Sequence, residues 1–253
     1  KQSQIEARDA EIRQQKTLRN ALIAGLLAVV LIILIVIYAY VQKRKDNQKI
    51  KEQNEQILEA NEELTTLNEA ISRQNREITD SIKYARRIQN ALLPPEDELD
   101  KLLPSYFILN KPRNIVSGDY YWVAHKDESV IIAVADCTGH GVPGAFMSIM
   151  GINFLNEIVK QSGTIKANEI LTELREKLIK SLGQTGQRDE TRDGMEMALC
   201  VLDAANYRLQ YSGAFRPMYL LRQNELIVIK GDPMPIGIYN EDEVPFTNKE
   251  IPF

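Results

Sequence analysis

The longest apolar stretch of the chain lies near its N-terminus and is uninterrupted. Residues 21–41 include no charged or strongly polar side chain. At a rise of about 1.5 Å per residue, a helix of this length reaches the roughly 30 Å of hydrocarbon in a bilayer. A buried core helix is usually shorter and keeps a polar face, and a signal peptide would be followed by a small-residue cleavage site. The pattern predicts a transmembrane helix at 21–41, preceded by a juxtamembrane helix at 1–20.

Charged residues on the two sides of this span indicate its orientation. Lys43, Arg44 and Lys45 follow it directly, which favours the cytoplasm for the rest of the chain. The N-terminal flank carries Arg8, Arg13, Lys16 and Arg19, so the basic residues on the two sides are nearly balanced. The two cysteines, Cys137 and Cys200, lack the spacing of a disulfide framework or a zinc site, which fits a reducing compartment. We expect a single-pass protein whose C-terminal part is cytoplasmic.

A polar segment without glycine or proline follows, and its pattern repeats every seven residues. The repeated aliphatic residues are Ile57, Leu64, Ile71 and Ile78, each preceded three positions earlier by Asn54, Asn61, Asn68 and Asn75. With asparagine at position a and the aliphatic residue at d, this is a weak coiled-coil seam. The opposite assignment, which puts Gln53, Ala60, Leu67 and Gln74 at d, is no better, and a single solvated helix is the alternative. We expect a parallel homodimeric coiled coil over residues 46–93, ended by Pro94 and Pro95.

Beyond Pro95 the pattern changes to short segments typical of a globular domain. Alternating apolar residues predict strands at 120–125, 130–135, 197–202, 207–211, 218–221 and 226–229. Helical periodicity predicts helices at 146–160 and 167–182. The short turns between the later strands imply antiparallel pairing. Residues 96–253 are therefore expected to form an α+β domain, a sheet or sandwich with helices packed outside it.

Two aspartates are predicted to face each other at the end of the first hairpin. If its turn is centred between Asp127 and Glu128, paired residue numbers sum to 255, so Asp119 lies opposite Asp136. Opposed residues have Cβ atoms roughly 4.5–5.5 Å apart, where like charges are destabilising. A cation between them would offset the repulsion, and carboxylate oxygens suit Mg²⁺ or Mn²⁺. Either aspartate alone is best explained as a strand-end cap, but the pair in register favours a metal site that activates water for attack on phosphorus.

The loop after Asp136 contains three glycines that match the GxGxxG pattern of dinucleotide-binding folds. That function does not fit, because the acid would repel pyrophosphate, Pro143 stands inside the loop, and a second helix follows where a strand is required. A thiol phosphatase would need arginine at position 143, six residues after Cys137. Cys200 lies in an apolar strand, typical of a core residue. His140 is expected to orient the glycine loop, and a phosphate contact stays open.

These motifs resemble the metal-dependent protein phosphatases of the stage II sporulation protein E type, bacterial relatives of the type 2C (PPM) phosphatases. The resemblance rests on Ser-Gly-Asp-Tyr-Tyr at 117–121 and Ala-Asp-Cys-Thr-Gly-His-Gly-Val-Pro-Gly-Ala at 135–145. Later matching stretches are 192–198, 213–217 and 235–237, and residues 81–89 resemble the helix that enters such domains in membrane-bound members. It covers roughly residues 81–253.

The resemblance implies a two-sheet antiparallel β-sandwich flanked by helices. It also implies that Asp119 and Asp136 bind two Mn²⁺ or Mg²⁺ ions and act through metal-bound water, with the backbone carbonyl of Cys137 as a further ligand. Most relatives carry a small residue in place of Cys137, and the change costs nothing if only the carbonyl coordinates. Asp193 is a candidate ligand for a third ion.

Further consequences of the resemblance concern phosphate binding and the end of the chain. Arg113 and His140 are candidate phosphate contacts, although a charge before a strand, such as Arg113, is usually solvated. The family uses two more aspartates in its last strands, and no stretch after Gly237 supplies them. We therefore expect the chain to be a fragment that stops short of these ligands and is nearly inactive alone.

The expected function is a serine/threonine protein phosphatase in bacterial signalling, anchored in the cytoplasmic membrane. Its substrate would be a phosphoprotein such as an anti-sigma-factor antagonist. One alternative is a non-catalytic docking protein that keeps the fold without metal. Another is a nucleotidyl cyclase, although cyclase aspartates do not normally face each other in one short hairpin. The net charge of −4 gives no reason to expect nucleic-acid binding.

Overall fold

The structure is a computed structural model that describes residues 2–161, 166–187, 192–239 and 244–252, with side chains from residue 8 onward. It divides into two compact units, residues 1–74 and residues 75–253.

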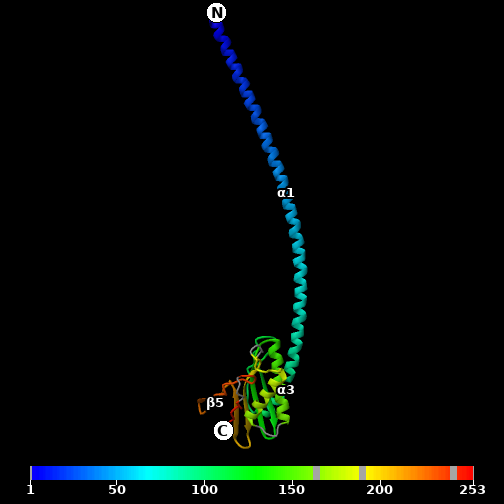
Figure 1. Ribbon diagram of the computed structural model, residues 1–253, viewed down its shortest axis with the longest axis vertical. Coiled ribbons are helices and arrows are strands. Elements are labelled where there is room, and N and C mark those ends of the chain that lie inside the picture. Colours follow the sequence, from blue (N-terminus) through cyan, green and yellow to red (C-terminus); the bar gives the residue numbers. More distant parts are fainter. Residues whose placement is uncertain (1, 162–165, 188–191, 240–243, 253) are drawn as a thin grey trace. The chain divides into compact units, whose positions relative to one another are not determined.

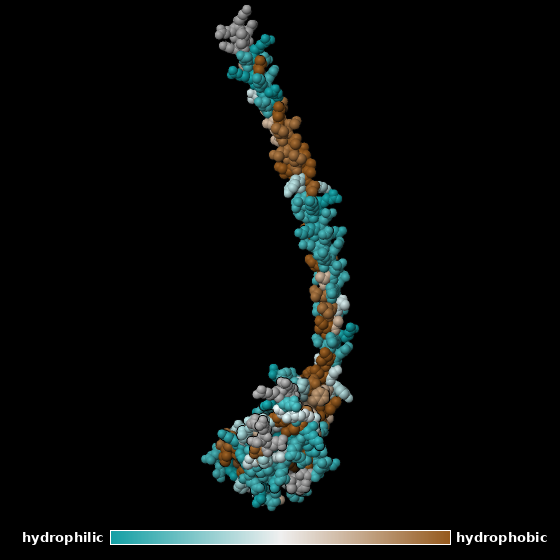
Figure 2. All heavy atoms as spheres, in the orientation of Figure 1, coloured by the Kyte–Doolittle hydropathy of each residue, from teal (hydrophilic) through white to brown (hydrophobic). Residues whose placement is uncertain are grey.

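Helix α1 (Gln2–Leu92) contains both the predicted transmembrane span and the predicted coiled-coil segment (Figure 1). Residues 21–41 form a continuous apolar band on it (Figure 2), and every side chain in this band is exposed. By length and composition, α1 could cross a membrane. Helix α3 (Val142–Gln161) passes the same test, but half of its apolar window is buried, as in a core helix. The helix ends two residues before Pro94, as predicted, because proline cannot continue the hydrogen-bond ladder.

The second unit is built on a five-stranded antiparallel sheet with strand order β1-β2-β3-β4-β7. The strands are β1 (Tyr120–Lys126), β2 (Ser129–Cys137), β3 (Met195–Asp203), β4 (Arg208–Ala214) and β7 (Lys249–Pro252). Strands β5 (Met218–Arg222) and β6 (Glu225–Ile229) form a separate two-stranded sheet, most of whose residues are exposed or half-buried. The predicted α+β class, with antiparallel sheets and packed helices, is confirmed.

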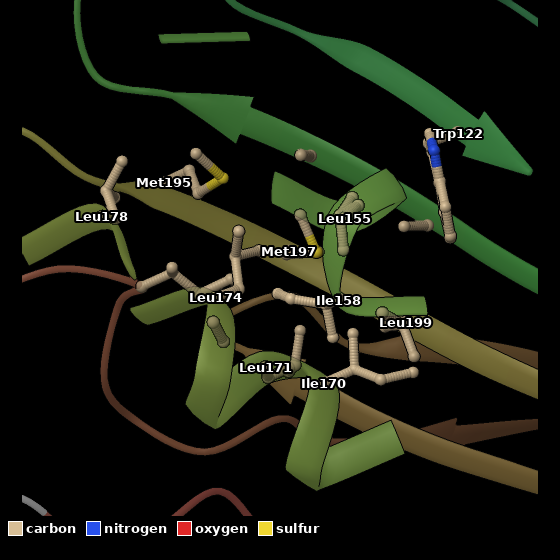
Figure 3. Close-up of a cluster of buried hydrophobic side chains, with 14 of the residues drawn as sticks. Trp122, Leu155, Ile158, Ile170, Leu171, Leu174, Leu178, Met195, Met197 and Leu199 are labelled. Atoms are coloured by element: carbon tan, nitrogen blue, oxygen red, sulfur yellow. The ribbon is translucent and has the colours of Figure 1, made fainter. Parts of the chain in front are cut away.

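One face of the five-stranded sheet packs against helices α3 (Val142–Gln161) and α4 (Ala167–Leu182). Figure 3 shows the side chains of both helices and of β3 pointing toward one another in this core. The buried residues labelled there are Trp122, Leu155, Ile158, Ile170, Leu171, Leu174, Leu178, Met195, Met197 and Leu199. The burial of β3 alternates along the strand, which is the pattern of a sheet with one face on the core.

Several elements differ from their predicted extent. Helix α3 begins at Val142, four residues earlier than predicted, because Pro143 lies in the first turn, where a helix has no use for its missing N–H. Strand β4 runs on to Ala214 instead of ending at residue 211. The short helix α2 (Glu96–Leu102), which begins directly after Pro95, was not predicted.

Candidate functional site

The first hairpin brings Asp119 and Asp136 to the same end of the sheet. Tyr120 pairs with Ala135 and Lys126 with Ser129, so paired numbers sum to 255 as predicted. Asp119 directly precedes β1, opposite Asp136 near the end of β2. The pKa of Asp119 is raised, first by partial desolvation and then by the hydrogen bond and negative charge of Asp136; Arg216 opposes this shift. The two carboxyl groups are therefore close enough to interact directly.

Glu196 and Arg216 complete an acidic corner around Asp136. Glu196 on β3 pairs with Asp136 across the ladder, which places two acids side by side. Arg216 follows β4 and forms ion pairs with both: its Nη2 contacts Asp136, and its Nε lies 2.8 Å from Glu196 Oε2. Its side chain is 45% exposed, so solvent still reaches the guanidinium. The corner thus contains three carboxylates and a single guanidinium among these four residues.

The glycines of the loop allow three backbone segments to pack closely beside Asp119. A Cβ on Gly118 would lie 3.3 Å from the Cys137 carbonyl oxygen and 3.2 Å from that of Gly139. A Cβ on Gly144 would lie only 2.8 Å from the Gly139 oxygen and 3.1 Å from the Gly118 Cα. Larger residues at these positions would push the segments apart. The Cys137 carbonyl, a ligand implied by the resemblance, therefore lies beside the residue that precedes Asp119.

Asp193 lies in the segment before β3 and contacts the end of β2 through Thr138. The Thr138 hydroxyl donates to Asp193 Oδ1 at 3.2 Å and accepts from the Gly194 N–H at 3.0 Å. The Thr138 N–H also donates to the Gly194 carbonyl at 2.9 Å. Asp193 is thus held against Thr138, which lies two residues after Asp136, on the β3 side of the corner.

The two candidate phosphate contacts lie on the surface, whereas the Cys137 thiol is buried. Arg113 and His140 are both exposed, and within the described ranges neither side chain makes a hydrogen bond or an ion pair. Cys137 is 5% exposed, and burial, followed by the charges of Asp136 and Asp119, raises its pKa well above the usual range. A thiol that stays protonated is a poor nucleophile. The structure therefore agrees with the exclusion of thiol-phosphatase chemistry.

The chemistry of the donor set fits a hard divalent cation. Among the described residues, no three His, Cys, Asp or Glu side chains converge on one point. The donors at this corner are instead the carboxylates of Asp119 and Asp136, with the Cys137 carbonyl close by. Mg²⁺ in particular is bound by one or two carboxylates and keeps several waters.

Glu196, Arg216 and Thr138 were not identified from the sequence. Glu196 and Arg216 lie inside stretches that resemble the family, at 192–198 and 213–217. The resemblance pointed to these stretches but assigned no role to either residue. The signal that would have found Glu196 is the register of β2 against β3. That register pairs residues whose numbers sum to 332, such as Asp136 and Glu196.

Comparisons with known proteins show which family and which solved fold the chain resembles. A family model described as stage II sporulation protein E (SpoIIE) matches residues 126–253. The protein named phosphoserine phosphatase RsbU of Bacillus subtilis (strain 168) is 32% identical over 103 residues, which are 39% of this chain and 29% of that protein. The chain thus spans less than a third of the length of this curated relative.

Among solved structures, the SiaA-PP2C domain of Pseudomonas aeruginosa is similar with a TM-score of 0.61 and 30% sequence identity. The similarity covers 70% of this chain and 68% of that structure. A match of this extent supports both the fold and the ancestry. With just over half of its residues matched by the family model, the chain belongs to the stage II sporulation protein E (SpoIIE) family.

Proposed function

We propose that the protein is a Mn²⁺- or Mg²⁺-dependent serine/threonine protein phosphatase of a bacterial signalling pathway. The observation that carries this proposal is the opposed pair Asp119 and Asp136 beside the Cys137 carbonyl. Membership of the SpoIIE family and similarity to a phosphoserine phosphatase support it. The substrate class is a phosphoprotein, such as an anti-sigma-factor antagonist.

In this proposal one group of residues binds the cations and another group binds the phosphate of the substrate. Asp119, Asp136 and the Cys137 carbonyl would hold two divalent cations, and Asp193 is the candidate ligand of a third. When bound, these ions would supply a water nucleophile at neutral pH. Arg113 and His140, both exposed, are the proposed contacts of the substrate phosphate.

The test of the metal centre uses the whole protein as its cell produces it, purified in detergent. Asp136→Asn keeps the shape of the side chain and removes its charge, so Mn²⁺ binding and release of phosphate from a phosphoserine peptide should both collapse. Asp127→Asn, at the opposite end of the hairpin, is the matched control and should leave both unchanged. Turnover that persists in EDTA or in Asp136→Asn would contradict the proposal. Partner binding without either activity would instead identify a docking protein.

We also propose that residues 21–41 anchor the protein in the bacterial cytoplasmic membrane, with the domain in the cytoplasm. The exposed apolar band of α1 and the Lys43-Arg44-Lys45 cluster support this topology. Single cysteines placed at Gln4 and at Gln48 test it in intact cells. A membrane-impermeant thiol reagent should label the cysteine at position 4 alone. Labelling at position 48 would contradict the orientation.

We further propose that the protein forms a parallel homodimer through residues 46–93. The aliphatic side chains at the heptad positions, Ile57, Leu64, Ile71 and Ile78, are between 46% and 57% exposed in the single chain. Burying them requires a second helix, and asparagine at the alternate seam positions would make that contact weak. A weak seam suits a helix that changes its arrangement when a signal arrives. Sedimentation of the chain in detergent measures the dimer.

A further inference from the structure

The last turn of α1 is fixed to the segment before Asp119 by one buried side chain, that of Gln89. Gln89 is 5% exposed, whereas its neighbours Ile88 and Asn90 are exposed. Its Nε2 donates to the Ser117 carbonyl at 2.6 Å, and its Oε1 accepts from the Ser117 N–H at 3.1 Å. The side-chain amide therefore pairs with both backbone groups of Ser117, as a strand would.

The same amide also contacts helix α3. Nε2 of Gln89 donates to Ser148 Oγ at 2.7 Å, and Ser148 is fully buried. The Ser148 hydroxyl lies 2.9 Å from the Ala145 carbonyl and 3.2 Å from the Ser117 carbonyl, so it can donate to either. Gln89 thus joins three parts of the chain at one buried point: α1, α3 and the segment that leads into β1.

This point lies two residues from the carboxylate pair. The Asp119 N–H donates to Ser117 Oγ at 3.0 Å, so Ser117 supports Asp119 as well. Between them, Gly118 is packed against the Cys137 and Gly139 carbonyls and the Gly144 backbone. A segment held on both sides in this way has little freedom to adjust if one of its supports moves.

We propose that Gln89 is a positioning residue that sets where the Asp119 carboxylate lies relative to Asp136, and that it links the end of α1 to the metal centre. This inference rests on the proposed function of the carboxylate pair. Outer partners that orient ligating carboxylates typically contribute 10- to 100-fold to metal affinity. Because Gln89 lies in the last turn of α1, a movement of that turn reaches Gln89 directly.

The decisive variant is Gln89→Glu, measured in the whole protein by calorimetric titration with Mn²⁺. Glutamate has the same shape but loses both N–H donors and sets an oxygen against the Ser117 carbonyl. Mn²⁺ affinity should fall about tenfold, at the lower end of the effect of partners that bond a ligand directly, because Gln89 acts on Asp119 through Ser117. Asn90→Ala, an exposed change on the adjacent residue, should stay within about twofold, as surface substitutions do. Unfolding followed by the fluorescence of Trp122, the single tryptophan, is recorded for each variant at the same time.

The outcomes separate this inference from the proposed function. Weakened Mn²⁺ binding in a Gln89→Glu protein that is still folded at the titration temperature supports the positioning role. Wild-type affinity in Gln89→Glu, beside lost affinity in Asp136→Asn, would show that Gln89 only stabilises the fold and would overturn the inference alone. Absence of Mn²⁺ binding in the wild type would overturn the metal centre and this inference with it. If Gln89→Glu does not fold, Gln89→Met, uncharged and similar in length, is judged by the same criterion.

Discussion

Helices α1 and α4 contain similar aliphatic side chains, but these side chains lie in different surroundings. In α4, Ile170, Leu174 and Leu178 are at most 2% exposed, because β3, β4 and α3 lie against them. In α1, Leu64 and Ile71 at the heptad seam are 56% and 46% exposed. The partners of the α4 side chains are in the same chain. The proposed partners of the α1 side chains are lipid and a second copy, so the two helices should respond differently to the same substitutions.

The largest effect is expected for truncation in the buried helix. Leu174→Ala removes a fully buried side chain and should lower the free energy of unfolding of the second unit by about 2–5 kcal/mol. Leu64→Ala on α1 is the matched change at an exposed position and should leave that unfolding transition in place. Urea unfolding followed by Trp122 fluorescence measures both, since Trp122 is buried in the same core and donates to Asn156 Oδ1 at 2.8 Å. Equal losses of unfolding free energy in the two variants would contradict the proposed difference between α1 and α4.

A charge in the apolar band of α1 should have the next largest effect. Leu31→Lys, at the centre of residues 21–41, costs about 2.5–3.5 kcal/mol in a bilayer. It should raise the carbonate-extractable share of the protein, although the remaining aliphatic residues of the band still favour insertion. Gln48→Lys lies beyond the band and should not. Equal extraction of the two variants would mean that lipid is not the partner of this band.

The heptad asparagines give a smaller and opposite effect. Changing Asn54, Asn61, Asn68 and Asn75 together to isoleucine should tighten the dimer at least about tenfold, because buried asparagine reduces the stability of a seam. Alanine at the following positions, Glu55, Glu62, Glu69 and Arg76, is the control outside the seam. Sedimentation of the whole chain in detergent gives the dissociation constants. A chain that stays monomeric in both variants would leave α1 without a helical partner.

The smallest effect is expected for an apolar side chain that is exposed within the second unit itself. Leu221 on β5 is 70% exposed, so Leu221→Ser should change the free energy of unfolding by no more than about 0.5 kcal/mol. Urea unfolding of this variant shows whether the exposure of the side chain, and not the unit to which it belongs, determines the loss of unfolding free energy. A loss as large as that of Leu174→Ala would show that β5 has a partner in the folded protein.

The local parts of the site could be predicted from the sequence because they depend on short-range rules. A two-residue turn and alternating apolar residues define the hairpin register, and the register places Asp119 opposite Asp136. The same reasoning located the helices that cover the sheet. The prediction placed Pro143 inside the glycine loop, but Pro143 lies in the first turn of α3, because proline suits the start of a helix.

The remaining parts could not be predicted because they depend on contacts between distant segments. Glu196 approaches Asp136 only after β2 pairs with β3, and two helices separate these strands along the chain. The role of Gln89 depends on the docking of α1 beside Ser117, 28 residues later. Neither contact leaves a periodic pattern in the sequence. The periodic rules therefore located the pair of aspartates but not the residues that surround it.

The ion pairs of Arg216 have a consequence for how the protein acquires its cations. Asp136 and Glu196 already share a positive group that belongs to the chain. The positive charge of Arg216 therefore offsets part of the repulsion between these two acids, which lie side by side across the ladder. Under the proposed function, a cation held by Asp136 would compete with this guanidinium for the same carboxylate. The half-exposed side chain of Arg216 would then supply a positive charge beside the site, tied to the chain at the end of β4.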